Sequence, residues 1–264
     1  MRKRDFSMLT LIRSLGFQIA YWGLSIFFVL TALPLLLVPG RKALMGWIRA
    51  YTKTMVAAMR HIAGIQTAVR GHENLPDGPF IVAAKHQSWG DGFVVFSQIP
   101  DLAFVTGDHL LRMPFLGPLL RKMGAIVVDN CGGAHARGQL VSDKMETIRS
   151  EGRRILIYPE GHLSDVGTQH RYRKGVYHIY AQYGCPVVPV ATDLGVRWPK
   201  QSWLKTAGPA SVEFLDPIPP GLDKDSFMAE LEAMIETRSL ALLEEQRAAG
   251  TLPAPYASQT PLSV

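Results

Sequence analysis

Cysteine is scarce in this chain of 264 residues, and its scarcity excludes two kinds of stabilisation. Only Cys131 and Cys185 are present, and no CxxC spacing occurs, so neither a disulfide framework nor a structural zinc site is expected. This cysteine usage is typical of a reducing compartment, and we expect the protein to face the cytosol.

Charged residues are also few. They make up 19% of the chain against 47% hydrophobic residues, which is apolar for a soluble protein and not apolar enough for a transporter with many spans. The formal net charge of +6 favours an anionic partner, either nucleic acid, a phospholipid surface or an acidic acyl carrier. Zinc-finger spacing, an RNP-like aromatic motif and a long basic helix are absent, which argues against nucleic acid. We therefore expect a membrane-attached globular enzyme.

One long stretch carries no charge at all. Residues 16–38 are an uncharged run of 23 positions, against the ~20 needed to span a bilayer. The run fits either a single span or a monotopic hairpin, in which Pro34 and Pro39-Gly40 end one helix and an amphipathic helix follows over residues 42–62. We favour the hairpin, because apolar residues recur at three- and four-residue steps along the second stretch. A cleavable signal peptide is disfavoured, since the run is long and lacks a clear cleavage site.

Beyond residue 65, short apolar runs alternate with helix-like stretches. Continuous apolar runs suit strands of a sheet that is buried on both faces. The alternation predicts an α/β fold with a mixed, mostly parallel sheet flanked by helices. We assign residues 1–64 to membrane-associating helices, 65–249 to the main domain and 250–264 to a free, disordered tail. Strands are expected at residues 80–84, 102–105, 125–128, 155–158, 187–190 and 211–215, and helices at 142–150, 175–183 and 225–248.

The strongest local signal is the segment KHQSWGD at residues 85–91, where an apolar strand ends and a helix is expected to begin. Asp91 lies one helical turn beyond His86, so its carboxylate can accept a hydrogen bond from Nδ1 of the imidazole. That bond would leave Nε2 free as a base. In the alternative interpretation, His86 is an ordinary polar residue and Asp91 only favours the helix N-terminus electrostatically.

A second polar segment, YPEGH at residues 158–162, also follows directly on an apolar strand. The basic run RYRKG comes after it at residues 171–175. Strand ends in an α/β fold expose reactive groups, so the two segments are expected to share one rim of the sheet. A serine hydrolase would need a GxSxG elbow, which the sequence lacks.

These segments resemble the motifs of the glycerolipid acyltransferase family, whose best-known member is the bacterial 1-acylglycerol-3-phosphate acyltransferase. The resemblance covers residues 65–220. The first block of the family, NHxSxxD, matches His86, Ser88 and Asp91, with Lys85 in place of Asn. The second block, a glycine, an apolar run and Asp-Arg, matches residues 124–129, with Asn130 in place of Arg.

The third and fourth blocks complete the resemblance. In the third, FPEGTRS, the chain keeps Pro159, Glu160, Gly161 and Ser164 but has Tyr158, His162 and Leu163 at the other positions. The fourth, VPV, is intact at residues 188–190. Four blocks in the same order make the match specific.

The resemblance implies an O-acyltransferase that moves a fatty acyl group from an acyl thioester to the hydroxyl of a lysolipid. It implies that His86 takes the hydroxyl proton, that Asp91 stabilises the imidazolium, and that Glu160 and the Gly161 backbone hold the acceptor. Transfer is direct, with Ser88 and Cys185 disfavoured as nucleophiles and no metal or cofactor required. The implied donor is acyl-carrier protein or acyl-coenzyme A, at the cytoplasmic face of a bacterial-type inner membrane. Further substrate-binding candidates are Lys85, Ser88, His162, Arg171, Arg173 and Lys174.

The two lost arginines bear on the acceptor, because an Arg fork is the favoured ligand for a phosphomonoester. Asn130 and Leu163 cannot replace it, so we predict a lyso-aminolipid of the ornithine type, with His162 as a candidate contact for its carboxylate. Lysophosphatidate stays open as the alternative. A non-catalytic lipid-binding protein and a hydrolase in which water replaces the acceptor are the rivals from other classes. Cations that could replace the lost arginines are Lys85, Arg137, Arg171, Arg173 and Lys174.

Overall fold

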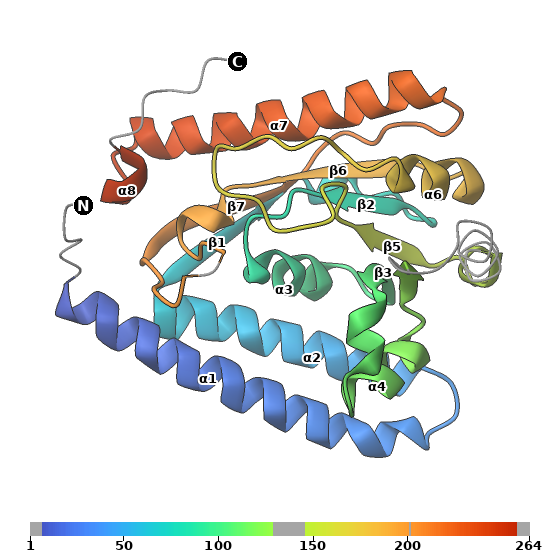
Figure 1. Ribbon diagram of the computed structural model, residues 1–264, viewed down its shortest axis with the longest axis horizontal. Coiled ribbons are helices and arrows are strands. Elements are labelled where there is room, and N and C mark those ends of the chain that lie inside the picture. The colour runs from blue at the N-terminus through green and yellow to red at the C-terminus, as the bar shows by residue number, and fades with distance from the viewer. Residues whose placement is uncertain (1–6, 129–145, 201, 258–264) are drawn as a thin grey trace.

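The computed structural model describes residues 7–128, 146–200 and 202–257. Within them, seven strands form one sheet in the order β1-β7-β6-β2-β5-β3-β4. Neighbouring strands are parallel except β6 and β7, which are antiparallel. The predicted α/β fold with a mixed, mostly parallel sheet is confirmed (Figure 1). The strands are β1 Ile65–Arg70, β2 Ile81–Ala84, β3 Leu102–Gly107, β4 Ile126–Val128, β5 Arg154–Ile157, β6 Val187–Thr192 and β7 Gly208–Phe214.

The position of each strand in the sheet explains which strands the sequence pattern revealed. The central strands β2 and β6 are buried along their whole length, because helices cover both faces there, and they read as continuous apolar runs. Strand β1 lies at the edge, and its residues alternate between buried and more exposed positions. Its sequence IQTAVR has no continuous apolar run, so the strand was not predicted.

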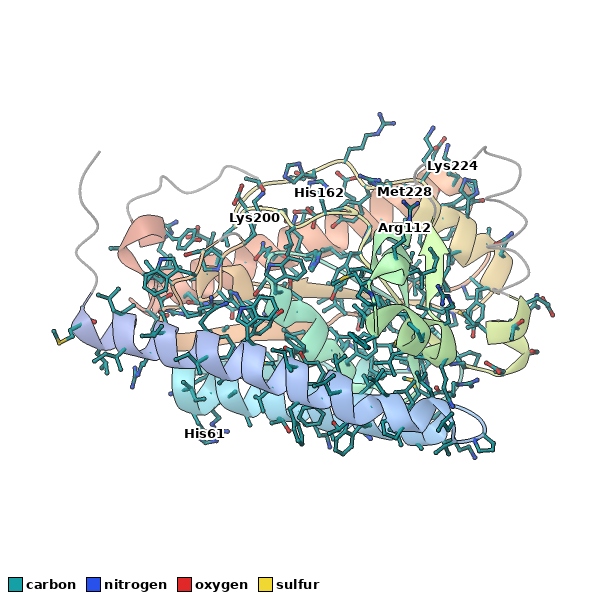
Figure 2. All side chains as sticks on the ribbon, turned by 60° about the horizontal axis from the view of Figure 1, so that its bottom comes forward. His61, Arg112, His162, Lys200, Lys224 and Met228 are labelled. Atoms are coloured by element: carbon teal, nitrogen blue, oxygen red, sulfur yellow. The ribbon has the colours of Figure 1, made fainter. Side chains whose placement is uncertain are left out.

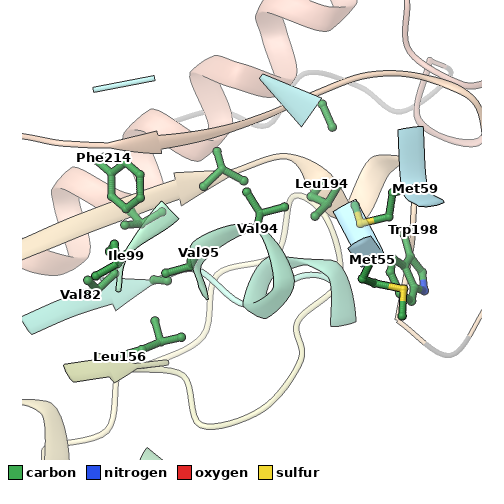
Figure 3. Packing of buried hydrophobic residues seen from close by; sticks show 14 of the residues in the cluster. Met55, Met59, Val82, Val94, Val95, Ile99, Leu156, Leu194, Trp198 and Phe214 are labelled. Carbon is green, nitrogen blue, oxygen red and sulfur yellow. The ribbon is translucent and has the colours of Figure 1, made fainter. Parts of the chain in front are cut away.

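Helices form a layer on each face of the sheet (Figure 1). One layer holds α6 (Gly175–Tyr183) and α7 (Lys224–Ala248), whose apolar residues pack on one face of the sheet in a single core cluster. The other holds α2 (Lys42–Ala58) and α3 (Trp89–Gln98). Figure 3 shows Val94 and Val95 of α3 packed among Val82 and Leu156 of the sheet and Met55 of α2. The short helix α4 (Leu116–Met123), which was not predicted, lies against α2.

The uncharged N-terminal run forms most of the first arm of a helical hairpin and the turn that ends it. Helix α1 (Met8–Ala32) continues into the 3-10 turn η1 (Leu33–Leu36), which contains Pro34, and α2 then packs against α1. The Oγ of Ser25 and the Oη of Tyr51 lie 2.7 Å apart across the hairpin. The predicted helix break is therefore present, and the choice between a span and a monotopic hairpin stays a prediction.

Apolar side chains cover the outer face of α1 (Figure 2). Among the described residues, one helical segment, Met8–Leu36, is long and apolar enough to cross a membrane. Large apolar groups are rarely left in water in such number, so this face is built for contact with lipid or another apolar surface. Those at least half exposed are Met8, Leu9, Ile12, Leu15, Ile19, Trp22, Ile26, Phe27 and Leu30.

The C-terminal part of the chain is attached to the domain as far as it is described. Helix α7 closely matches the predicted range 225–248. Within the predicted tail, the carbonyl of Thr251 accepts a hydrogen bond from Arg197 at 2.7 Å, and Ala254–Ala257 form the short helix α8. Residues 258–264 lie outside the described part of the chain, as do residues 142–145 of the helix predicted at 142–150, whose other residues, 146–150, are helical.

Candidate active site

The turn that carries His86 is fixed by the start of helix α3. Ser88 is the N-cap residue, and its Oγ accepts a hydrogen bond from Gly90 N at 3.0 Å. In return, Asp91 Oδ2 accepts from the backbone N–H groups of Gln87 and Ser88, both at 2.8 Å. This capping box satisfies amides that would otherwise be unpaired at a helix start. The segment between β2 and α3 is thereby held in one conformation.

The imidazole of His86 contacts the carboxylate of Asp91 in the predicted way. Nδ1 of His86 lies 3.3 Å from Asp91 Oδ2, the same oxygen that caps the helix. The Asp91 side chain is only 2% exposed, whereas that of His86 is 17% exposed, so the imidazole remains within reach of a substrate. A buried carboxylate on Nδ1 orients the ring and leaves Nε2 as the basic nitrogen.

Tyr158, at the end of β5, stacks on the imidazole of His86. The ring centroids of His86 and Tyr158 are 3.9 Å apart, with 19° between the ring planes. Burial, followed by the charge of Asp91, raises the pKa of the Tyr158 phenol well above its usual value, so the ring is neutral. The stack limits rotation of His86. The sequence offered a signal, since Tyr158 opens the third block, but it was not assigned to the site.

The turn after β5 holds the backbone of His86 on both sides. Glu160 Oε1 accepts from His86 N at 3.2 Å, while Ser164 N and Ser164 Oγ donate to His86 O at 2.7 and 3.0 Å. Gly161 has a φ of +70°, a conformation that favours glycine, and its N–H donates to Tyr158 O at 2.9 Å. The first and third blocks are thus brought together around one residue.

Several predicted substrate-binding residues are occupied by contacts within the protein. Lys85 is 1% exposed and pairs with Glu160 at 3.4 Å and with Glu236 at 2.7 Å. Glu160 is equally buried, and both of its oxygens bond to protein donors. Ser88 is fully buried as the N-cap. These contacts give all three residues structural roles, and a substrate contact by any of them stays a prediction.

The remaining candidates lie on the predicted rim. His162 is exposed on the loop after β5 (Figure 2), with its Nδ1 2.9 Å from Glu160 O and its ring centroid 4.7 Å from that of His170. The backbone N–H of Arg173 donates to Pro159 O at 2.8 Å, which ties the basic segment to the turn beside His86. Arg171, Arg173 and Lys174 are all exposed. Asn130 and Arg137 lie outside the described residues.

Comparison with known proteins identifies the family to which this site belongs. Residues 66–193 match the family model described as Acyltransferase. Over 191 residues the chain is 32% identical to the 1-acyl-sn-glycerol-3-phosphate acyltransferase of Pseudomonas aeruginosa, covering 72% of each protein. The chain belongs to the acyltransferase family. The predicted acyltransferase activity is thereby confirmed, and the rival of a non-catalytic protein loses its support.

Two further proteins are similar to this acyltransferase, one in sequence and one in fold. It is 26% identical over 218 residues to the human 1-acyl-sn-glycerol-3-phosphate acyltransferase alpha, covering 81% of this chain and 76% of that protein. The crystal structure of the 1-acyl-sn-glycerophosphate (LPA) acyltransferase of Thermotoga maritima superimposes with a TM-score of 0.69 at 22% identity. That superposition covers 88% of this chain and 95% of the other, and it shows a shared fold.

Cys185 of the acyltransferase lies in a setting that disfavours a nucleophile. It is 6% exposed, and burial raises the pKa of its thiol to about 12, so the thiolate is scarce at neutral pH. It also precedes β6, whereas His86 follows β2, a strand parallel to β6, so the two lie at opposite ends of the sheet.

We expect Cys185→Ala to retain acyl-transfer activity within about twofold, because the thiol takes no part in the reaction. Steady-state rates of the purified variant, normalised to folded protein, check this. A loss of more than about tenfold without loss of folded protein would point to an acyl-enzyme at Cys185.

An apolar cavity of about 250 Å³ lies near His86 and Asp91 of the acyltransferase, between the hairpin helices α1 and α2 and the helices α3 and α4. Trp89 and Gly92, which flank Asp91 closely in the sequence, line it together with Trp47 and Tyr51 of α2. None of its described lining residues is charged. Such a lining suits a hydrocarbon chain.

Proposed function

We propose that this acyltransferase is a lysophosphatidate O-acyltransferase, which transfers a fatty acyl group from acyl-carrier protein or acyl-coenzyme A to the free hydroxyl of 1-acylglycerol 3-phosphate. The relatives described above carry this acceptor in their names. None of them supports the lyso-aminolipid acceptor that the sequence pattern favoured. Arg173 is the structural observation that carries the proposal.

Arg173 places a guanidinium against the third-block turn, where the family has an arginine and this chain has Leu163. A Cβ atom at position 161 would lie 2.5 Å from Nε and 3.0 Å from Cζ of Arg173, so Gly161 leaves room for that guanidinium. The Arg173 side chain forms no ion pair with another described residue, so it is available for a phosphate. A guanidinium is the favoured partner of phosphate oxygens, and Arg173 therefore removes the main reason for preferring a phosphate-free acceptor.

The geometry around His86 supports direct transfer. Nε2 takes the proton of the acceptor hydroxyl while the hydroxyl oxygen attacks the thioester carbonyl. The tetrahedral intermediate then collapses, the carbon–sulfur bond breaks, and the imidazolium returns the proton to the leaving thiolate. Asp91 stabilises the imidazolium between the two steps, since its carboxylate lies against Nδ1.

The hairpin and the apolar cavity supply the lipid environment in this proposal. The cavity beside Trp89 accepts an acyl chain, and the exposed apolar face of α1 inserts into the bilayer. Trp89 itself is 57% exposed, as expected for an aromatic ring at a membrane interface. The cytoplasmic face of a bacterial-type inner membrane stays a prediction.

A direct comparison of acceptors tests the proposal. With one donor, kcat/KM is expected to be at least about tenfold higher for lysophosphatidate than for a lyso-ornithine lipid of the same chain length. Arg173→Gln is expected to raise the KM for lysophosphatidate about 10- to 100-fold, because a charge-assisted hydrogen bond contributes about 1.5 to 3 kcal/mol. The KM for the lyso-ornithine lipid is expected to change little.

Arg149→Gln is the matched control, since Arg149 is exposed and precedes β5, at the end of the strand opposite Tyr158. Equal or better use of the lyso-ornithine lipid would contradict the proposal, and so would an unchanged KM in Arg173→Gln. Release of free fatty acid without an acylated lipid product would indicate the hydrolase.

A further inference from the structure

A buried polar network connects helix α7 to the catalytic histidine. Lys85 Nζ lies 2.7 and 2.9 Å from the two carboxylate oxygens of Glu236. The same ammonium lies 3.4 Å from Glu160 Oε2, and the other oxygen of Glu160 accepts from the backbone N–H of His86 at 3.2 Å. Three side chains therefore link α7 to the residue that performs the chemistry.

The network is closed by further hydrogen bonds and shielded from water. Lys85 and Glu160 are 1% exposed and Glu236 is 7% exposed. Tyr172 Oη donates to Glu236 Oε1 at 2.8 Å, and Lys85 Nζ also donates to the carbonyl of Thr168 at 3.1 Å. An unpaired buried charge is strongly destabilising, so each of these ions depends on the others.

Of the three ionic residues, only Glu160 is a residue of the family motifs. Lys85 stands where the first block has Asn, and Glu236 lies beyond residues 66–193, which match the family model. With Glu160 as its sole counter-ion, a buried Lys85 would draw that carboxylate away from His86 N. Glu236 makes the two shorter contacts to the ammonium and leaves Glu160 in place under His86.

We propose that Glu236 is a positioning residue that acts through Lys85 and Glu160 to hold the backbone of His86 in its reactive orientation. The inference rests on the proposed function, because it assigns Glu236 to the same transfer reaction. In this proposal, helix α7 helps to hold the catalytic histidine in place.

Glu236→Gln tests the role, because glutamine keeps the volume of the side chain and can still accept from Tyr172 but lacks the charge. Glu236→Gln is expected to lower kcat about 10- to 100-fold, since a misplacement of about 1 Å costs about 100-fold in rate. The KM for the acyl donor and the KM for lysophosphatidate are expected to stay within about twofold of the wild-type values. The double variant Lys85→Asn/Glu236→Gln removes the ammonium that would draw Glu160 away. It is expected to recover to within about fivefold of the wild-type kcat. Glu230→Gln, on the exposed side of α7, is the matched control.

Amide hydrogen exchange of peptides that span residues 85–91 reports the same positioning without turnover. Exchange there is expected to rise about tenfold in Glu236→Gln, to return in the double variant, and to stay unchanged in Glu230→Gln. If Glu236→Gln does not fold, Glu236→Asp replaces it, because aspartate keeps the charge but holds it one methylene group further from Lys85. Its effects on kcat and on amide exchange are expected to have the same direction and to be smaller.

Wild-type kcat and wild-type exchange in Glu236→Gln would overturn the positioning role, as would a double variant as slow as the single one. A wild-type enzyme that transfers nothing to lysophosphatidate would overturn the proposed function instead. The exchange measurement would then still decide whether Glu236 positions His86.

Discussion

His86→Ala is expected to lower the kcat of acyl transfer about 10²- to 10⁴-fold, the range that a positioned general base contributes. The acceptor hydroxyl then has no base at the point of attack, because Asp91 is 2% exposed and sits behind the imidazole. Steady-state and single-turnover rates of the purified enzyme with a saturating acyl donor measure the loss.

The control for this variant is His178→Ala. His178 is exposed on α6 and contacts neither Asp91 nor Tyr158 through any described hydrogen bond or ring contact. The fold is expected to survive in His86→Ala, since Asp91 keeps both backbone bonds that cap α3. A His86→Ala enzyme with near wild-type kcat would refute the mechanism.

The second large effect is expected at Asp91, where orientation and charge can be separated. All described hydrogen bonds to Asp91 use Oδ2, while Oδ1 is buried without a described partner. In Asp91→Asn the amide oxygen can take the place of Oδ2, so the turn survives and only the charge is lost. We expect kcat to fall about 10- to 100-fold, less than in His86→Ala, because a hydrogen bond to a charged group contributes about 1.5 to 3 kcal/mol.

Asp91→Ala removes the acceptor as well as the charge. Two backbone amides lose their partner, so we expect an additional loss of about 1 to 2 kcal/mol in the free energy of unfolding and a kcat below that of Asp91→Asn. Denaturant unfolding in detergent, run beside the kinetics, separates the two losses. Equal stability and equal kcat in the two variants would show that the capping bonds do not hold the site.

The contact between His86 and Asp91 could be predicted from the sequence because it is local. His86 and Asp91 are five residues apart, and a helix start at Ser88 is sufficient to bring them together. The third block could be placed beside them because β2 and β5 are neighbouring parallel strands, whose carboxyl ends share one edge. Buried central strands are long apolar runs, so both were visible in the sequence.

The contacts that the sequence did not reveal join distant segments. The acceptor was assigned from the missing arginines at positions 130 and 163. Arg173 was one of five cations named as possible replacements, and only the fold shows that its guanidinium lies against the turn that carries Leu163. Glu236 is 151 positions from Lys85, and no spacing rule relates a terminal helix to a strand end. Lys85 was taken as a substrate ligand for the same reason, since its buried partners could not be seen without the fold.

The hairpin of α1 and α2 is packed into the core of the domain, so it cannot be removed without exposing that core. Phe17, Met55 and Met59 are fully buried in the same cluster as Val82 and the other sheet residues on that face. Truncation at residue 64 would strip that layer from the sheet and take away two walls of the apolar cavity. The hairpin is therefore not a detachable segment: α1, whose outer face is apolar and exposed, also forms one wall of this cavity.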